Sequence, residues 1–265
     1  MRVLMVTLEL ADPVFSGNGV YGRTIVEALV SAGVYVDVLC GAPADDADGP
    51  PFASHTALAA AASDSRLRVA RVPLPVWEKV DRGAAFSAFA EGAAAAISTL
   101  LDGSGEYDLL IGVDWTAAAA LDRVRVLLPT SPKVVHMNFR VFFAQLELLD
   151  GADDLEFYTE KERVACAQAD TVITLTAADA ATLAPLLPPT ASTAILAPPL
   201  RADIAALATR PPLGQAPRRR FITICARISE EKCIAEYVGI CCAARDTLNE
   251  LGACVLVRAI YRYCF

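Results

Sequence analysis

Short, largely apolar runs alternate along this chain with stretches whose apolar residues have helical spacing. Residues 3–8 form a continuous apolar run and residues 35–39 the second predicted strand, with a helix expected over about residues 20–32 between them. Strands that are apolar at every position are typical of parallel sheets, because helices cover both faces. The alternation predicts an α/β fold built on a Rossmann-like parallel sheet.

The same pattern predicts the other elements of the first domain. Gly33 stands where the cap at the C-terminus of the first helix belongs. Residues 41–65 are rich in Ala, Asp, Pro and Ser, which favours a surface loop. Further strands are expected at residues 67–74, 107–113, 133–139, 171–175 and 193–197, and helices at 84–101, 117–128 and 156–169.

Frequent prolines between residues 185 and 217 indicate a domain edge and a linker. We therefore expect an N-terminal Rossmann-like domain at residues 1–200, a linker at 201–217 and an incomplete second domain at 218–265. The last segment predicts one β-α-β unit, with strands at 221–226 and 253–257 and a helix at 230–250. So little sheet does not close a core alone, which predicts docking on the first domain or an incomplete domain.

Composition excludes several classes of function. The net charge is −8, and residues 218–220 form the one basic run, so a nucleic-acid partner is not expected. No apolar run reaches the roughly 18 residues that a membrane-spanning helix needs. The eight cysteines form no Cys-x-x-Cys pair and only two histidines are present, so neither a metal site nor another cofactor is predicted. Reduced cysteines as small apolar residues indicate a cytoplasmic protein.

Two segments suit an anionic ligand. Arg227 and Lys232 follow the apolar strand at residues 221–226, where a guanidinium and an ammonium group can hold phosphate oxygens. Gly17 and Gly19 follow the first strand, at a turn where the backbone can approach a ligand closely. Together the two segments point to an enzyme that uses a nucleotide sugar.

The order of these segments resembles the retaining glycosyltransferases of the GT-B fold, and within them family 4, which is related to glycogen and starch synthases. The resemblance rests on residues 1–9, on Gly17-Asn18-Gly19, on Asp114-Trp115 and on the segment from Arg227 to Lys232. Residues 169–176 also resemble a strand late in the first domain of that family. It implies two Rossmann-like domains facing each other across a cleft, with the donor mostly in the second and the acceptor mostly in the first.

The resemblance also implies roles for residues. Gly17, Asn18 and Gly19 fall on the loop that approaches the donor phosphates, and Arg227 and Lys232 on the pair that holds the diphosphate. Such a pair neutralises the charge that builds on the leaving group without a metal. UDP- or ADP-hexose is the expected donor, and a hydroxyl compound of unknown identity is the acceptor.

A further set of residues is expected near the transferred sugar. Family members often carry a histidine at the end of the strand that corresponds to residues 133–139, where this chain has His136 three residues before Phe139. Strand alternation sends His136, Asn138 and Arg140 to one face, where they would line a cleft edge. His136 and Asp114 are the candidate catalytic side chains, although Asp114 also suits a structural role at a strand end and His136 a role in the core. The acidic residues between 156 and 162 predict a solvated helix face.

Other readings stay open at this point. Members of the family have a pair of glutamates, seven residues apart, late in the second domain. This chain ends before that region, so we expect a truncated transferase. Its incomplete second domain is expected to self-associate. An inactive remnant or binding module is the alternative. A nicotinamide-dependent oxidoreductase fits the spacing of Gly17, Gly19 and Gly22, but Cys40-Gly41 stands where a ribose-binding acid belongs.

Overall fold

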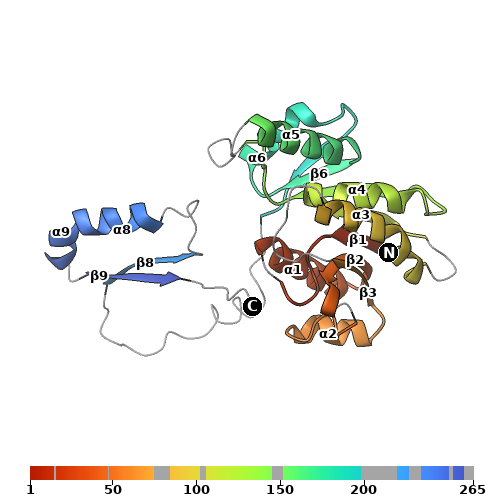
Figure 1. Ribbon diagram of the computed structural model, residues 1–265, viewed down its shortest axis with the longest axis horizontal. Coiled ribbons are helices and arrows are strands. Elements are labelled where there is room, and N and C mark those ends of the chain that lie inside the picture. The colour runs from red at the N-terminus through yellow and green to blue at the C-terminus, as the bar shows by residue number, and fades with distance from the viewer. Residues whose placement is uncertain are drawn as a thin grey trace. The chain divides into compact units, whose positions relative to one another are not determined.

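The structure is a computed structural model, and it describes residues 1–14, 16–46, 48–74, 84–101, 106–144, 152–197, 220–226, 234–250 and 253–259. The chain divides into two compact units, Met1–Arg201 and Ala202–Phe265. Both are drawn in Figure 1. The expected linker, residues 201–217, lies outside the described residues.

A seven-stranded sheet forms the centre of the first unit. Its order is β3-β2-β1-β4-β5-β6-β7, and each strand pairs in parallel with its neighbours. The predicted Rossmann-like parallel sheet is thereby confirmed. The strands are β1 (Arg2–Thr7), β2 (Tyr35–Pro43), β3 (Leu67–Leu74), β4 (Leu109–Val113), β5 (Lys133–Asn138), β6 (Thr171–Thr174) and β7 (Ser192–Ile195).

Helices cover both faces of this sheet, as Figure 1 shows. Alternate residues of β1 divide between the two layers: Val3 and Met5 belong to the core beneath α1 and α2, whereas Leu4 and Val6 belong to the core beneath α3 and α4. Because both faces are buried, residues 3–6 of β1 are all apolar. The helices of this unit are α1 (Gly17–Ser31), α2 (Thr56–Ser63), α3 (Ala84–Ala96), α4 (Asp114–Arg125), α5 (Ala152–Ala167) and α6 (Ala177–Leu183), with short 3₁₀ turns at Ala44–Asp46, Ile97–Thr99 and Ala184–Leu186.

Two helices begin three residues earlier than the sequence pattern predicts. The Ser16 hydroxyl accepts a hydrogen bond from the Asn18 N–H and caps α1, so residues 17–19 form its first turn rather than a loop. Helix α4 starts at Asp114, directly after β4. At the other end of α1, Gly33 has φ +80° and its N–H donates to Val30, which confirms the predicted helix end.

The predicted loop at residues 41–65 is wrong in two places. Strand β2 continues to Pro43, and α2 fills Thr56–Ser63. An alanine-rich segment propagates as a helix here because His55 caps it by accepting a hydrogen bond from the Leu58 N–H, and Leu58 is buried in the core.

The second unit contains a parallel pair of strands, β8 (Arg220–Ala226) and β9 (Ala253–Ala259). The predicted β-α-β unit is present, but the expected single helix is divided into α8 (Ile234–Ala243) and α9 (Arg245–Glu250). In the part of the chain that the structure describes, no helix has the length and apolar character needed to cross a bilayer.

A charged cluster joins the amino ends of three strands. Asp37 of β2 is 3% exposed and accepts hydrogen bonds from Arg2 of β1 at 3.0 Å and from Arg68 of β3 at 2.7 and 2.8 Å. The Tyr107 hydroxyl donates to the same carboxylate at 2.8 Å, and both guanidinium groups also donate to the Leu100 carbonyl. Burial, and then the Asp37 carboxylate, raise the pKa of Tyr107. This cluster holds together the amino ends of β1, β2 and β3.

Candidate functional site

Several polar residues that the sequence singled out meet at the carboxyl ends of β1 and β4. From β1 the chain continues into α1 on one face of the sheet, and from β4 into α4 on the other face. In open α/β sheets, ligands bind at such a switch point. The sheet order therefore identifies this edge as the candidate site.

Asn18 and Asp114 join the two connections directly. The Asn18 side-chain amide donates a hydrogen bond to one oxygen of Asp114, although 96 residues separate them in the chain. The other Asp114 oxygen accepts the N–H of Phe139, just after β5, at 2.8 Å. One carboxylate thus joins the chain segments that follow three adjacent strands, β1, β4 and β5.

Asp114 is unusual in both backbone and environment. Its φ is +55°, in the left-handed region that Asp and Asn adopt more readily than most residues, which allows the chain to turn from β4 directly into α4. The side chain is 2% exposed. Burial raises the pKa of Asp114 to about 7; the Phe139 N–H opposes the shift and the nearby Glu162 charge adds to it.

The glycines of the first turn of α1 have different surroundings. Gly17 is exposed, and a Cβ there would meet nothing within 4 Å. A Cβ on Gly19 would lie 2.6 Å from Val14 Cγ1 and 2.7 Å from Glu9 Oε1. The buried Glu9 carboxylate is held at 2.6 Å by both the N–H and the hydroxyl of Ser16. Gly19 thus makes room for an internal carboxylate, whereas Gly17 leaves open space.

Replacing the two glycines separately distinguishes these roles. We expect Gly19→Ala to lower the free energy of unfolding by about 1–3 kcal/mol, because Val14 and the anchored Glu9 must move. Gly17→Ala is expected to leave stability within about 0.5 kcal/mol or raise it slightly, since alanine favours a helix. Urea unfolding followed by circular dichroism measures both changes, and equal losses in the two variants would contradict the assignment.

His136 lies in β5 opposite Gly112 of β4 and is 2% exposed. Burial lowers the pKa of His136 to about 4, so the imidazole is neutral near pH 7. Its Nε2 atom has no hydrogen-bond partner among the described residues.

Asn138 and Arg140 lie at the end of β5 and just beyond it. Asn138 is 1% exposed; its amide lies near enough to Glu162 to lower the pKa of that carboxyl, yet it forms no hydrogen bond of good geometry with a described residue. The guanidinium of the half-buried Arg140 lies over the Phe142 ring, 4.9 Å from its centroid. Of the predicted side chains in the first unit, Asn18 contacts Asp114, and Asp114, His136 and Asn138 are buried.

The prediction of a solvated acidic face on α5 is wrong for one of its members. Glu160 is exposed and forms an ion pair with Arg163 at 2.7 Å, but Glu162 is 0% exposed and accepts the N–H groups of Phe142 and Phe143. The burial of Glu162 follows the helical spacing of apolar residues, because Ala165 and Cys166, three and four residues further on, are also buried.

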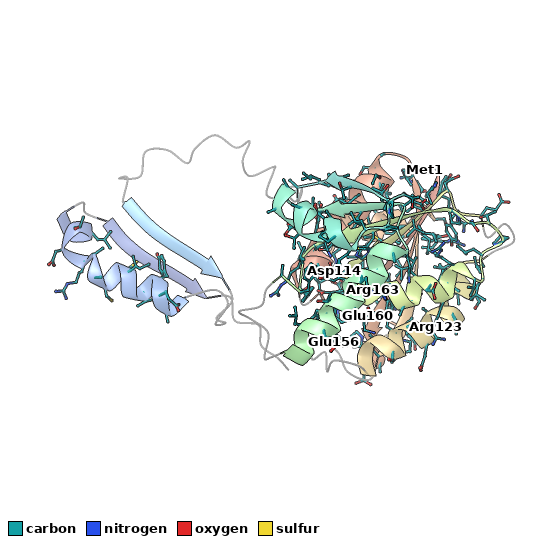
Figure 2. All side chains as sticks on the ribbon, turned by 90° about the horizontal axis from the view of Figure 1, so that it is seen from above. Met1, Asp114, Arg123, Glu156, Glu160 and Arg163 are labelled. Carbon is teal, nitrogen blue, oxygen red and sulfur yellow. The ribbon has the colours of Figure 1, made fainter. Side chains whose placement is uncertain are left out.

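Trp115, the residue after Asp114, packs in an aromatic cluster rather than at the switch point. Its ring contacts Phe142, Phe157 and Tyr158. A groove of about 300 Å³ lies beside this cluster between α3, α4 and α5, and Arg123 and Glu160 are among its lining residues. Figure 2 labels both, together with Asp114 at the start of α4.

Arg227 and Lys232 lie outside the described residues. Within the ranges that the structure does describe, no three His, Cys, Asp or Glu side chains group closely enough to hold a metal ion.

The comparison with protein families identifies the family to which the chain belongs. The profile of the glycosyl transferase 4-like domain matches residues 16–199, more than half of the chain, and these residues include the α1 turn, Asp114 and Glu162. The chain belongs to this family. The glycosyl transferase 4-like domain thus occupies nearly all of the first unit.

Solved structures of GT-B glycosyltransferases share the fold. A sucrose-phosphate synthase from Thermosynechococcus elongatus matches with a TM-score of 0.65 and 16% identity, over 97% of this chain and 62% of that one. The catalytic domain of starch synthase IV from Arabidopsis thaliana, bound to ADP and acarbose, has a TM-score of 0.56 and 13% identity over 98% of this chain and 68% of that one.

A UGT transferase from Siraitia grosvenorii in complex with UDP has a TM-score of 0.53 and 13% identity, over 86% of this chain and 59% of that one. The chain spans about 62% of the length of the sucrose-phosphate synthase described above. A search of curated proteins found no match.

Proposed function

We propose that the chain transfers a hexose from a nucleoside-diphosphate sugar to an acceptor hydroxyl with retention of configuration. The observation that carries this proposal is the contact between Asn18 and Asp114 at the switch point of a glycosyl transferase 4-like domain. Structural neighbours bound to UDP and to ADP support a UDP- or ADP-hexose as the donor.

The donor phosphates would approach at Gly17, where an added Cβ meets nothing and the first turn of α1 presents its N-terminus. Arg227 and Lys232 would hold the diphosphate and neutralise the charge that develops on it as the bond to the sugar breaks. Asn18 and Arg140 would contact substrate from the first unit.

Asp114 and His136 fit a supporting role better than contact with the reacting atoms. Both side chains are 2% exposed, and both Asp114 oxygens already accept hydrogen bonds. Asp114 would hold Asn18 and the segment after β5 in place, and His136 would contribute a buried, neutral imidazole within β5. Asn138, equally buried, would act in the same way.

Two further parts of the proposal concern self-association and cellular location. Self-association through the second unit is supported by Val238 and Ile240, which are 42% and 68% exposed on α8. A cytoplasmic location rests on the cysteine argument from the sequence.

Donor binding tests the proposed function. We expect the wild-type chain to bind UDP-glucose or ADP-glucose with micromolar affinity by calorimetry, and Arg227→Ala with Lys232→Ala to weaken binding by about thirtyfold or more, since hydrogen bonds to charged groups contribute about 1.5–3 kcal/mol.

The matched control removes two other cations. Arg66→Ala with Lys133→Ala deletes the cations of two exposed ion pairs, to Asp64 and Asp170, near the amino ends of β3 and β5. We expect donor affinity to be unchanged in that control. Absence of binding to either donor by the wild-type chain, or an equal loss in the control, would rule out the proposed donor site.

A further inference from the structure

The segment that follows β5 leaves the sheet with backbone groups that no strand satisfies. The pairing of β5 with β6 ends at Asn138 and Thr174, and residues 139–144 continue without a strand partner. Buried N–H groups in such a segment need other acceptors. Glu162 of α5 supplies them.

Each oxygen of the Glu162 carboxylate accepts one N–H of this segment. Oε1 accepts from Phe142 at 2.8 Å and Oε2 from Phe143 at 3.2 Å. A buried carboxylate is costly unless hydrogen bonds compensate for its lost hydration. Burial accordingly raises the pKa of Glu162, while these two N–H groups and the Asn138 amide oppose the shift.

The segment is held at its other end too. Its first N–H, that of Phe139, donates to Asp114, and Val141 is buried in a core cluster with Cys166 and Leu183. Arg140 lies between these anchors, and its positive charge opposes part of the rise in the pKa of Asp114 and of Glu162 that burial causes. The direction in which Arg140 leaves the sheet is therefore fixed from both sides.

We propose that Glu162 is a positioning residue, which fixes the segment after β5 and thereby directs Arg140 to the substrate site. This inference rests on the proposed function for its consequence in binding, but its structural content does not. Glu162 differs from Glu160 in its contacts: Glu162 accepts two backbone N–H groups, whereas the exposed Glu160 pairs with Arg163.

Amide hydrogen exchange of the ligand-free protein tests the structural content. The Phe142 and Phe143 amides are expected to be protected in the wild-type chain, although they lie outside regular secondary structure. Glu162→Gln keeps the size of the side chain but leaves one oxygen to accept, and its NH₂ group faces the other N–H. We expect exchange of at least one of these amides to accelerate by about tenfold.

Glu160→Gln is the matched control, because it makes the same change two residues away on the exposed side of α5. It is expected to leave exchange at Phe142 and Phe143 unchanged. Unprotected Phe142 and Phe143 amides in the wild-type chain would overturn the proposal, and this measurement does not depend on whether any variant folds.

A double-mutant cycle on donor affinity tests whether Glu162 acts through Arg140. Glu162→Gln and Arg140→Gln are each expected to weaken donor binding by about tenfold, and the double variant to bind no more weakly than Arg140→Gln alone. Independent, multiplicative losses would overturn the link to Arg140. A wild-type chain that binds neither donor would refute the proposed function, and the exchange rates would still decide the role of Glu162.

Discussion

Asp37→Ala is expected to lower the free energy of unfolding of the first unit by about 3–5 kcal/mol. The carboxylate is the shared acceptor for Arg2, Arg68 and the Tyr107 hydroxyl, and its side chain is 4% exposed. Alanine leaves two guanidinium groups, each about one quarter exposed, facing one another without their counter-ion. Removing one partner of a buried ion pair typically costs this much.

Chemical unfolding followed by tryptophan fluorescence measures the loss, because Trp115 is buried in the first unit. Asp64→Ala is the matched control: its carboxylate is 62% exposed and pairs with Arg66 at 2.7 Å. An exposed pair contributes about 0–1 kcal/mol, so this control is expected to change little. A similar decrease in the free energy of unfolding in the two variants would show that the Asp37 cluster does not stabilise the sheet.

The stability of the first unit is expected to fall by about 2–3 kcal/mol between pH 5 and pH 8 through Asp114. Burial raises its pKa from 3.8 to about 7, so the folded chain holds a proton that the unfolded chain has released. The stabilisation is full below the unfolded pKa and is lost as pH rises through the folded pKa. Among the described residues, the charges that act on Asp114 are those of Glu162 on α5 and Arg140 after β5.

Asp114→Asn removes this titration while keeping a residue that tolerates positive φ. We expect the variant to fold and its stability to fall less steeply from pH 5 to pH 8, with the remaining slope in the same direction because Glu162 also has a raised pKa. Asp122→Asn changes an exposed carboxylate on the same helix and should reproduce the wild-type slope. An unchanged slope in Asp114→Asn would mean that Asp114 is ionised across this range.

The sequence predicts the sheet well because most of its strands contain runs of apolar residues, such as residues 3–6 of β1 and 109–111 of β4. The strand at residues 67–74 is predicted to the residue, and the bounds of the other strands lie within a few residues of the prediction. Helix starts were harder to predict. The Ser16 cap and the left-handed turn at Asp114 depend on hydrogen bonds and backbone angles that apolar spacing does not contain.

The site was predictable in its location rather than in its contacts. Residues after parallel strands converge on one edge of the sheet, which brings Asn18 near Asp114 and Asp114 near Phe139. The contacts of the buried carboxylates were not predictable in the same way. The roles of Glu9 and Glu162 depend on N–H groups of Ser16, Phe142 and Phe143 that become their donors only in the folded chain.

The strand order has a consequence for how the protein is made. Strands β2 and β3 can add to β1 soon after it leaves the ribosome, and β5, β6 and β7 each dock on the strand synthesised just before. Only β4 must return to β1, and Arg2 and Asp108, which meet at that junction, are 106 residues apart. Closing so long a loop carries the largest entropic cost in the sheet. The contact between Asn18 and Asp114 spans the same junction, so a nascent chain acquires its site only when its two halves join.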